Sequence, residues 1–589
     1  MDTRSKAQCM KDGDAASADQ SAESPFRTLD HAAQAWIARC TGGLSPAALS
    51  LAFMDWFVHL LAAPGKQMEL AALAAQGCGQ LIRPGRGITA PASGLPRDSR
   101  FQAPGWQTEP FLFWHQAFQL TEQWWHSATH DIPGTTHHHQ DVVSFAARQW
   151  LDIFSPGNFA LTNPEVLTYT AATCGANLIQ GAANACEDVW RAATNQRGAA
   201  KRRFEPGVDV AVTPGSVVFR NHLIELIQYR SSTAQVAAEP LLIVPAWIMK
   251  YYILDLSPHN SLVRYLVDQG YTVFCISWRN PDEQDRDLGF DDYRRLGVMA
   301  ALDAISRILP ERKIHTAGYC LGGTLLTIAA AAMANRQDDR LASITLFAAQ
   351  TDFTEPGELQ LFVDESEVNL LESMMWERGY LGGDQMGGSF QLLRSNDLIW
   401  SRAVHDYLLG KRAPTTDLAS WNEDRTRMPY RMHSEYLRQL FLDNDLACAR
   451  YTVDGRPISL RNIAAPMFVV GAERDHIAPW RSVYKIHHLA DTDLTFVLTN
   501  GGHNAGIISE PGHANRHFHI LCTAEADLSV GPDEWIETAE DRDGSWWPAW
   551  AAWLDTHSSA PRVAPPRLGL PDEDGATLAD APGTYVFQQ

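Results

Sequence analysis

The sequence predicts an α/β fold, in which a mostly parallel sheet has helices on both faces and follows a mainly α-helical N-terminal domain. Three observations lead to this prediction. Short, continuously apolar runs recur after residue 240 with helical segments between them, as expected for strands buried on both faces. Residues before about 205 show only helical spacing of apolar side chains. One apolar run passes directly into an apolar helix through the glycine-framed turn at 318–323.

Length, charge and cysteine spacing limit what the chain can be. Its 589 residues predict two to four domains, at roughly 100–200 residues each. The formal net charge of -21 disfavours nucleic acid as a partner. The longest apolar stretch, 47–63, is interrupted by Asp55 and His59, so we expect no transmembrane segment. No two cysteines have C-x-x-C spacing, and we expect no metal site.

Four regions follow one another along the chain. Residues 1–27 are small and polar and predict a disordered leader. Residues 28–205 predict the helical N-terminal domain, and residues 206–557 predict the α/β catalytic domain. Residues 558–589 contain many prolines and small residues and predict an extended C-terminal tail.

The helices of the N-terminal domain are indicated by capping residues and by periodicity. Ser45 is an N-cap followed by proline at the first helical position, and that helix should end near Pro64. Segments 110–125 and 141–156 repeat apolar residues at helical spacing.

The strands begin after residue 206. Segment 208–229 alternates apolar and polar residues around a Pro-Gly turn, as antiparallel strands do. Six apolar runs predict the parallel strands, at 240–246, 271–278, 313–319, 342–349, 466–472 and 494–499. Residues 351–461, between the fourth and fifth of these runs, are helical and rich in aromatic residues. We expect this insertion to form a cap over the active site.

A catalytic triad is predicted where three of these strands end. Cys320 lies between Gly318 and Gly322 at a strand-to-helix turn, the position of the nucleophile in an α/β-hydrolase. That fold presents nucleophile, acid and histidine in this chain order. Asp475 follows the strand at 466–472, and His503 follows the strand at 494–499. Order and context together predict Cys320, Asp475 and His503 as the triad.

Other residues compete for these roles. Glu473 is a rival acid, but its position one step earlier in the turn favours a solvated loop charge. Cys275, in the middle of a strand, is better explained as a small core residue. The later histidines at 513, 517 and 519 lack a preceding strand. The run His137–His139 resembles a metal-binding tract, but no second cluster accompanies it and surface polarity explains it better.

A cysteine at this turn has a chemical consequence. The thiolate is the reactive form, and a neighbouring imidazole favours it. Attack on a thioester exchanges one C–S bond for another, so the acyl group stays activated. Cys320 therefore favours acyl transfer from a thioester to an alcohol over hydrolysis of an ordinary ester. The oxyanion hole should use the backbone N–H of Leu321 and a second N–H after the strand at 240–245, at Trp247 or Ile248.

An ordered set of motifs resembles the polyhydroxyalkanoate synthases. The resemblance runs from about residue 28 to the end of the chain. The motifs are "SPGNFALTNPEVL" at 155–167, "KYYILDL" at 250–256, "SWRNPD" at 277–282, "GYCLGG" at 318–323, "LLRSNDLIW" at 392–400, "DHIAPW" at 475–480 and "GGHNAG" at 501–506. The residues around Cys320 are more similar to the single-subunit class I enzymes.

The resemblance implies polymerisation of (R)-3-hydroxyacyl-CoA into polyester with release of CoA. It implies that Cys320 is acylated and that His503 and Asp475 serve it. It links Arg394 to the phosphates of CoA, although a salt bridge within the cap explains that arginine equally well. Tyr252 and Trp421 become candidates for lining the substrate channel or for packing.

The same resemblance implies partners and a place in the cell. No cofactor is expected, because CoA is part of the substrate and a product. A homodimer working in the cytoplasm, at the surface of polymer granules, is implied.

Two residues depart from the pattern of the family. Met249 stands where asparagine is expected, and Asn504 stands where an aliphatic residue is expected. A thioesterase or depolymerase of the same fold, and a non-catalytic granule-binding protein, are the alternatives.

Overall fold

The computed structural model describes residues 25–82, 98–194, 204–385, 395, 399–412, 414–569 and 577–589. They form two compact units that alternate along the chain. The catalytic unit comprises the residues up to Gly43, residues 203–385 and residues 416–589, and the helical unit comprises residues 44–202 and 386–415. The domains predicted from the sequence are each one continuous segment, and their boundaries stay predictions. Most of the predicted leader lies outside the described residues, and helix α2 begins at Pro25.

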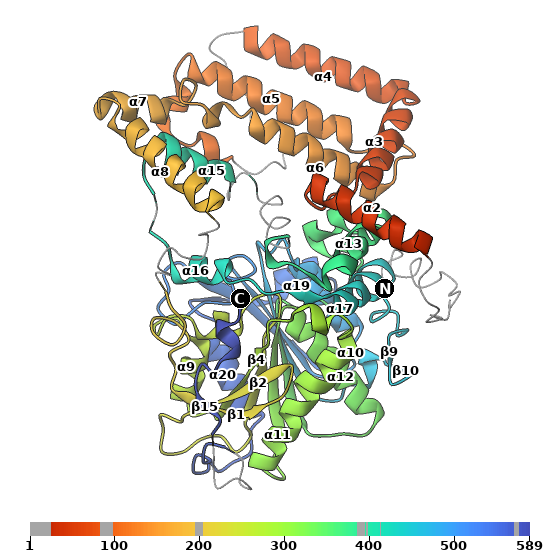
Figure 1. Ribbon diagram of the computed structural model, residues 1–589, viewed down its shortest axis with the longest axis vertical. Helices are drawn as coiled ribbons and strands as arrows, with labels where there is room; N and C mark the ends of the chain where they lie inside the picture. Colours follow the sequence, from red (N-terminus) through yellow and green to blue (C-terminus); the bar gives the residue numbers. More distant parts are fainter. Residues whose placement is uncertain are drawn as a thin grey trace. The chain divides into compact units, whose positions relative to one another are not determined.

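The catalytic unit is built on an 11-stranded sheet (Figure 1). The strands lie in the order β14-β13-β12-β11-β6-β5-β3-β4-β2-β1-β15. Six of them, from β12 to β4 in this order, pair in parallel, as the apolar runs predict. The bounds are β1 Gly215–Arg220, β2 Ile224–Tyr229, β3 Leu241–Val244, β4 Val273–Trp278, β5 Ile314–Tyr319, β6 Leu341–Phe347, β11 Met467–Ala472, β12 Leu494–Thr499, β13 His517–Thr523, β14 Glu540–Asp543 and β15 Ala579–Asp580.

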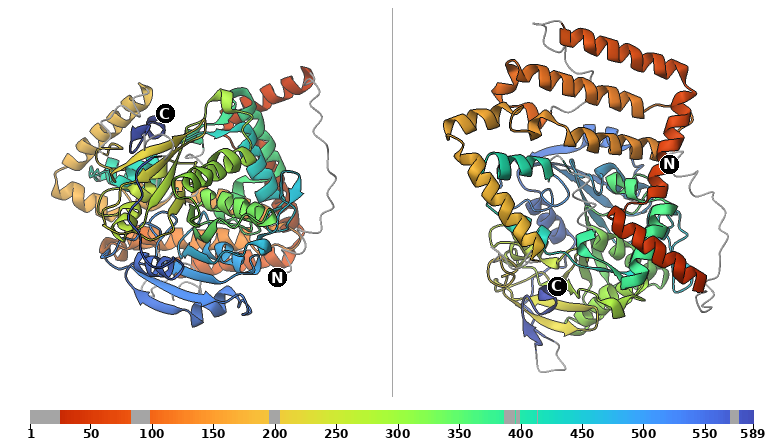
Figure 2. Two further views of the ribbon diagram at one scale, coloured as in Figure 1. Left: turned by 90° about the horizontal axis from the view of Figure 1, so that it is seen from below. Right: turned by 45° about the horizontal axis from the view of Figure 1, so that its top comes forward.

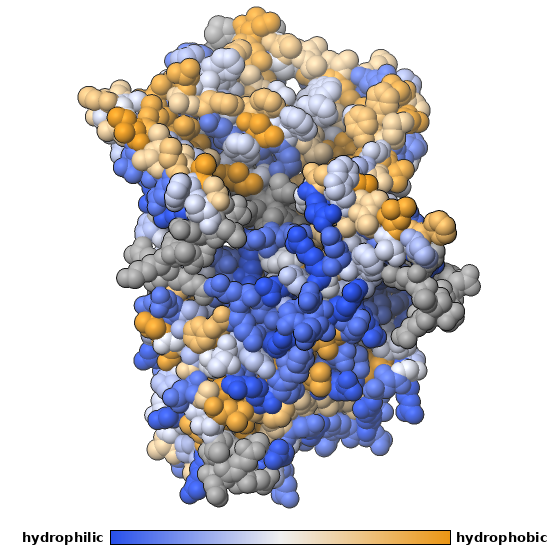
Figure 3. Space-filling model, in the orientation of Figure 1, coloured by the Kyte–Doolittle hydropathy of each residue, from blue (hydrophilic) through white to orange (hydrophobic). Residues whose placement is uncertain are grey.

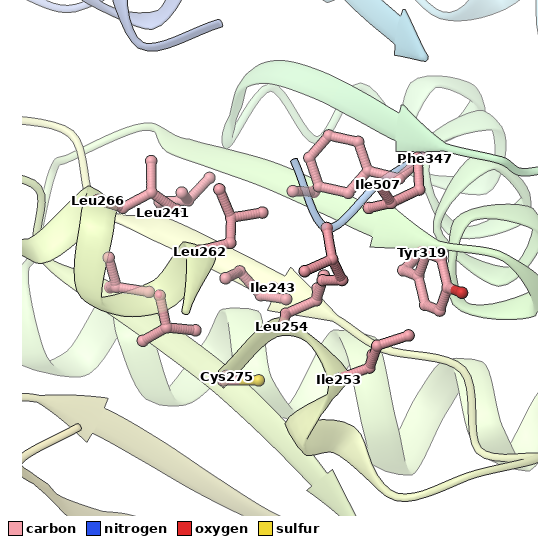
Figure 4. Close-up of a cluster of buried hydrophobic side chains, with 14 of the residues drawn as sticks. Leu241, Ile243, Ile253, Leu254, Leu262, Leu266, Cys275, Tyr319, Phe347 and Ile507 are labelled. Carbon is pink, nitrogen blue, oxygen red and sulfur yellow. The ribbon is translucent and has the colours of Figure 1, made fainter. Parts of the chain in front are cut away.

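Helices cover both faces of the sheet. Figure 1 shows α9 (Leu262–Asp268) and α20 (Trp547–Thr556) on one side and α11 (Ala300–Ile308) and α12 (Leu321–Asn335) on the other. Every residue of β3, β4 and β5 is buried. Figure 4 shows part of this core, in which side chains of the strands meet those of α9 and of the loops at the strand ends. The predicted α/β-hydrolase core is confirmed.

The first hairpin differs from its prediction in one respect. Strands β1 and β2 are antiparallel, as expected. The turn between them lies at residues 221–223, whereas Pro214 and Gly215 precede or begin β1. The Asn221 side chain accepts hydrogen bonds from the backbone N–H groups of Leu223 and Ile224 and so closes the turn. The turn is therefore marked in the sequence by an asparagine whose side chain bonds to the backbone that follows it, and not by the Pro-Gly pair.

The helical unit confirms a mainly α-helical N-terminal region. Ser45 caps α3 by accepting a hydrogen bond from the N–H of Ala48, and the helix ends at Leu61, before Pro64. Large apolar side chains on the surface of the helical unit are exposed, including Phe53 and Trp150. Figure 3 shows hydrophobic residues, in orange, on the face of these helices that it presents. The main helices are α3 Pro46–Leu61, α4 Pro64–Ile82, α5 Phe111–Thr129, α6 His137–Ile153, α7 Pro164–Ala172 and α8 Ala176–Ala193. In the described residues no single helix is long and apolar enough to cross a membrane, although α2 and α3 meet that test jointly.

The insertion between β6 and β11 is largely helical, as expected. Its helices are α13 Glu365–Arg378, α15 Ser401–Ala403, η10 Val404–Leu408, α16 Asp417–Glu423, α17 Tyr430–Glu435 and η11 Tyr436–Leu442. Helix α2 (Pro25–Thr41), red in Figures 1 and 2, lies beside α13. The rings of His31 and Trp376 stack 5.3 Å apart, and Arg39 pairs with Glu377 over 2.6 Å. The most N-terminal described helix therefore belongs to the catalytic unit.

The described part of the C-terminal tail is packed on the sheet. β15 pairs with β1, and the carboxylate of Glu225, fully buried in β2, accepts hydrogen bonds from the N–H groups of Thr584 and Tyr585. Val586 is buried as well. The sequence predicts an extended C-terminal tail, and in its described part the side chain of Val586 joins the buried core of the catalytic unit.

Candidate active site

Cys320 occupies a sharp turn between β5 and α12. Its backbone lies in the left-handed region at φ 51°, which few residues other than glycine adopt. The turn is held because the N–H of Cys320 donates a 2.8 Å hydrogen bond to the carbonyl of Phe347 on the neighbouring strand β6. The side chain is partly exposed. A strained, accessible residue at the carboxyl edge of a parallel sheet is typical of a nucleophile.

The glycines around Cys320 are required by close packing. A Cβ on Gly322 would overlap the backbone of Val244 and Pro245 at the end of β3. A Cβ on Gly323 would collide with the Cβ of Ala349 and the carbonyl of Gly318. Helix α12 can therefore approach the sheet closely enough to hold Cys320 in place only because these side chains are absent.

Asp475 lies in the turn after β11 and is fixed by three hydrogen bonds. Its Oδ1 accepts from the N–H groups of Ile477 and Ala478, at 2.9 and 2.8 Å. Its Oδ2 lies 2.7 Å from Nδ1 of His503. The rival acid Glu473 lies elsewhere, with its carboxylate 3.6 Å from His517. Of the two acids considered, the structure brings Asp475 to the histidine.

His503 follows β12, bonds to Asp475 and interacts electrostatically with Cys320. Burial alone lowers the pKa of its imidazole. The charges of Asp475 and then of Cys320, with hydrogen bonds to both side chains, outweigh burial and hold the pKa well above its ordinary value. With Nδ1 bound to Asp475, Nε2 is the nitrogen left for Cys320. The arrangement can accept a proton from the thiol and stabilise the resulting imidazolium.

The loop after β3, where a second oxyanion donor is predicted, is tied to the cap insertion. The N–H of Thr426 donates to the carbonyl of Ile248 over 3.3 Å, and its hydroxyl donates to the carbonyl of Trp247. Met249 forms a β-bridge with Arg425. Leu321, the first residue of α12, presents the N-terminal end of that helix next to Cys320. The use of these N–H groups as oxyanion donors stays a prediction.

Comparison with known proteins identifies the family. Residues 97–266 match the family described as poly-beta-hydroxybutyrate polymerase (PhaC) N-terminus, residues 24–66 match poly-beta-hydroxybutyrate polymerase N terminal, and residues 239–509 match the alpha/beta hydrolase fold. The poly(3-hydroxyalkanoate) polymerase of Methylorubrum extorquens is 41% identical over 83% of this chain and 81% of its own. The chain belongs to the poly(3-hydroxyalkanoate) polymerase family.

Two further polymerases support this assignment. The poly(3-hydroxyalkanoate) polymerase subunit PhaC of Rhizobium meliloti (strain 1021) is 37% identical over 85% of this chain and 81% of its own. The subunit PhaC of Cupriavidus necator is 38% identical over 84% of both chains. Membership of the polymerase family makes the chain an acyltransferase on an α/β-hydrolase fold.

The polymerase resemblance also singled out three residues outside the triad. Trp421 is buried and its indole N–H donates to the carbonyl of Lys250 over 2.8 Å. Tyr252 is buried and its hydroxyl donates to the carboxylate of Asp424 over 2.9 Å. Both side chains thus connect the loop after β3 to the cap insertion. Arg394 lies outside the described residues.

Sequence reasoning missed other residues near the site. Burial raises the pKa of Tyr436 in the cap insertion, and the charge of Cys320 adds to this shift. Lys250 is buried, and its ammonium group donates to the carbonyls of Tyr585 and Gln588 in the C-terminal tail. Neither contact has a local sequence signal, because each joins segments far apart in the chain.

Proposed function

We propose that the chain polymerises (R)-3-hydroxyacyl-CoA thioesters into a polyester and releases CoA, with Cys320 as the acylated nucleophile. The observation that carries this proposal is the residue type at the elbow. A thiol occupies the strand-to-helix turn, and its charge acts on a buried His503–Asp475 pair in a chain of the polymerase family. A thioester formed on Cys320 retains the activation that the next ester bond requires.

The first step is acylation. His503 accepts the thiol proton at Nε2, while Asp475 holds Nδ1 and stabilises the imidazolium. The thiolate attacks the carbonyl carbon of the substrate thioester, and the oxyanion is stabilised by the N–H groups of Leu321 and Ile248. The C–S bond to CoA then breaks, and the leaving thiolate takes the proton from His503. Atoms and charge balance, and no cofactor is needed.

The second step is chain extension. A 3-hydroxyl group attacks the acyl thioester on Cys320 while His503 accepts its proton. A C–O ester bond forms, the C–S bond to Cys320 breaks, and the thiol is regenerated with the proton from His503. One imidazole can serve both steps, because His503 passes the proton that it accepts to a sulfur atom each time, to that of CoA in the first step and to that of Cys320 in the second.

The substrate and partner assignments follow from this proposal. We assign the CoA phosphates to Arg394, since a guanidinium fork matches phosphate. We assign Tyr252 and Trp421 a supporting role beside the substrate channel, because both side chains are buried and their polar atoms bind Asp424 and Lys250. The enzyme works as a homodimer in the cytoplasm at the surface of the polymer granule. The exposed apolar side chains of the helical unit are suited to that surface.

The deciding experiment supplies purified protein with 3-hydroxybutyryl-CoA and follows both CoA release and polymer. Polymer formation that is lost in Cys320→Ala supports the proposal. Cys522→Ala, which removes an exposed cysteine on β13, is the matched control and should keep full activity. Free acid without polymer would assign a thioesterase. Unchanged CoA release by Cys320→Ala would remove Cys320 from the chemistry.

A further inference from the structure

A hydrogen bond joins the residue before the nucleophile to the residue after the histidine. The hydroxyl of Tyr319 donates to Oδ1 of Asn504 over 2.6 Å. The rings of Tyr319 and His503 lie 5.5 Å apart. The two bonded residues are separated by 185 positions in the chain, so the bond connects two loops that only the fold brings together.

Tyr319 is a rigid anchor on the nucleophile side. It is the last residue of β5, it pairs with Phe347 on β6, and it is 2% exposed. Figure 4 shows its ring at the margin of the buried cluster with the hydroxyl directed away from the aliphatic side chains. Burial raises the pKa of the phenol well above its ordinary value, and the charges of Cys320 and Asp475 add to this, so the hydroxyl keeps its proton.

Asn504 anchors a loop that is rich in glycine. Gly501 has φ 116°, a conformation that other residues rarely adopt. The carbonyl of Asn504 accepts the N–H groups of Ile507 and Ile508, so this residue also starts the turn that closes the loop. Asp475 fixes the His503 ring at Nδ1. The side chain of Asn504 gives the backbone next to His503 a separate attachment to β5.

We infer that the Tyr319–Asn504 hydrogen bond is a positioning link that sets the contact between His503 and Cys320. This inference rests on the proposed function, which gives those two residues the chemistry. Neither Tyr319 nor Asn504 exchanges a proton with substrate; each acts by holding His503. A displacement of about 1 Å in such a contact can cost about 10²-fold in rate.

The test compares Tyr319→Phe, Asn504→Leu and the double variant. Each single change should lower kcat by about tenfold with KM little changed, since positioning rather than binding is lost. The double variant should be no slower than either single one, because the two side chains act through one bond. The rate at which iodoacetamide alkylates Cys320 at neutral pH should fall in parallel. Asn504→Asp, which keeps an acceptor oxygen, should recover most of the loss seen in Asn504→Leu.

Tyr271→Phe is the matched control. Tyr271 is also buried, and its hydroxyl bonds to Asp555 over 2.7 Å in the same unit. It should lose stability without slowing alkylation of Cys320. Wild-type kcat and alkylation in both Tyr319→Phe and Asn504→Leu would overturn the link, as would losses that multiply in the double variant. If Cys320→Ala itself still released CoA, the proposed function would fail instead, which keeps the two failures distinct.

Discussion

The indole N–H of Trp421 in the cap insertion donates a 2.8 Å hydrogen bond to the backbone carbonyl of Lys250. Lys250 follows the loop that carries Ile248, and its own ammonium group bonds to the carbonyls of Tyr585 and Gln588. The proposed oxyanion loop is thus held by the cap insertion on one side and by the C-terminal tail on the other. Its position depends on both.

Trp421→Phe should therefore lower activity as well as stability. The buried Lys250 carbonyl loses its donor, which costs about 1–3 kcal/mol, and the loop should relax enough to reduce kcat by about tenfold. Steady-state CoA release and urea unfolding measure the two effects. Trp550→Phe is the control, because it removes a buried 3.0 Å indole bond to Thr345 in the core. Equal loss of kcat in both variants would contradict a specific role for Trp421.

Asp475→Asn should reduce CoA release by about 10²–10⁴-fold. The amide cannot hold the imidazolium of His503 as the carboxylate does, and it can leave the imidazole in the wrong tautomer. Glu473→Gln alters the neighbouring acid, which lies near His517, and should keep full activity. The opposite ranking, measured under the same conditions, would exchange the roles of the two acids.

Stability of the catalytic unit should fall with rising pH because of His503. The pKa of His503 is raised in the folded chain, so protonation stabilises the fold fully below about pH 6.5, and this contribution is lost as pH rises through the higher folded value. Urea unfolding of Cys320→Ala from about pH 6 to about pH 9 should show this decline without titration of the thiol. The Cys320→Ala, Asp475→Asn double variant should show a much smaller decline. Equal slopes would argue against the His503–Asp475 pair as its source.

Gly323→Ala should damage the elbow. Its Cβ would meet the Cβ of Ala349 and the carbonyl of Gly318, neither of which is the flexible end of a side chain. We expect loss of activity and about 1–3 kcal/mol of destabilisation, as for other overpacked cores. Gly79→Ala in helix α4 has open space around the new methyl group and should gain up to about 1 kcal/mol. Thermal unfolding of both variants checks the contrast.

Glu122 in the helical unit supplies a second pH dependence, of separate origin. Burial raises its pKa to about 7, against the opposing pull of Arg100, which donates to it over 2.6 Å. A carboxyl whose folded pKa lies above its unfolded value of 4.5 binds extra protons when folded, so stability should decline from about pH 4.5 to about pH 7. Glu122→Gln should flatten this decline, as followed by tryptophan fluorescence. A decline that persists unchanged would assign it to other groups.

The parts that sequence could predict are those with local signals. Cys320, Asp475 and His503 could be predicted as neighbours because each follows an apolar strand and is marked by glycine or a turn, and the structure places Oδ2 of Asp475 2.7 Å from Nδ1 of His503. The bond between Tyr319 and Asn504 has no such signal, since both residues look like ordinary neighbours of the triad. The placement of α2 against α13 was missed for the same reason. His31 and Trp376 stack on each other, but they lie far apart in the sequence and no local spacing pattern connects them. The hairpin turn at Asn221 was missed because a stronger Pro-Gly signal lay nearby.

The buried carboxylate of Glu225 has a consequence for the folding of the catalytic unit during synthesis. Its partners at Thr584 and Tyr585 are synthesised about 360 positions later, so during translation β2 carries an acidic group with only Arg220 of the hairpin to neutralise it. Burial of that charge becomes favourable only once the tail arrives. Completion of the sheet edge therefore waits for residues far downstream, and a nascent chain lacking these residues should be a better substrate for chaperones and proteases than a chain that contains them.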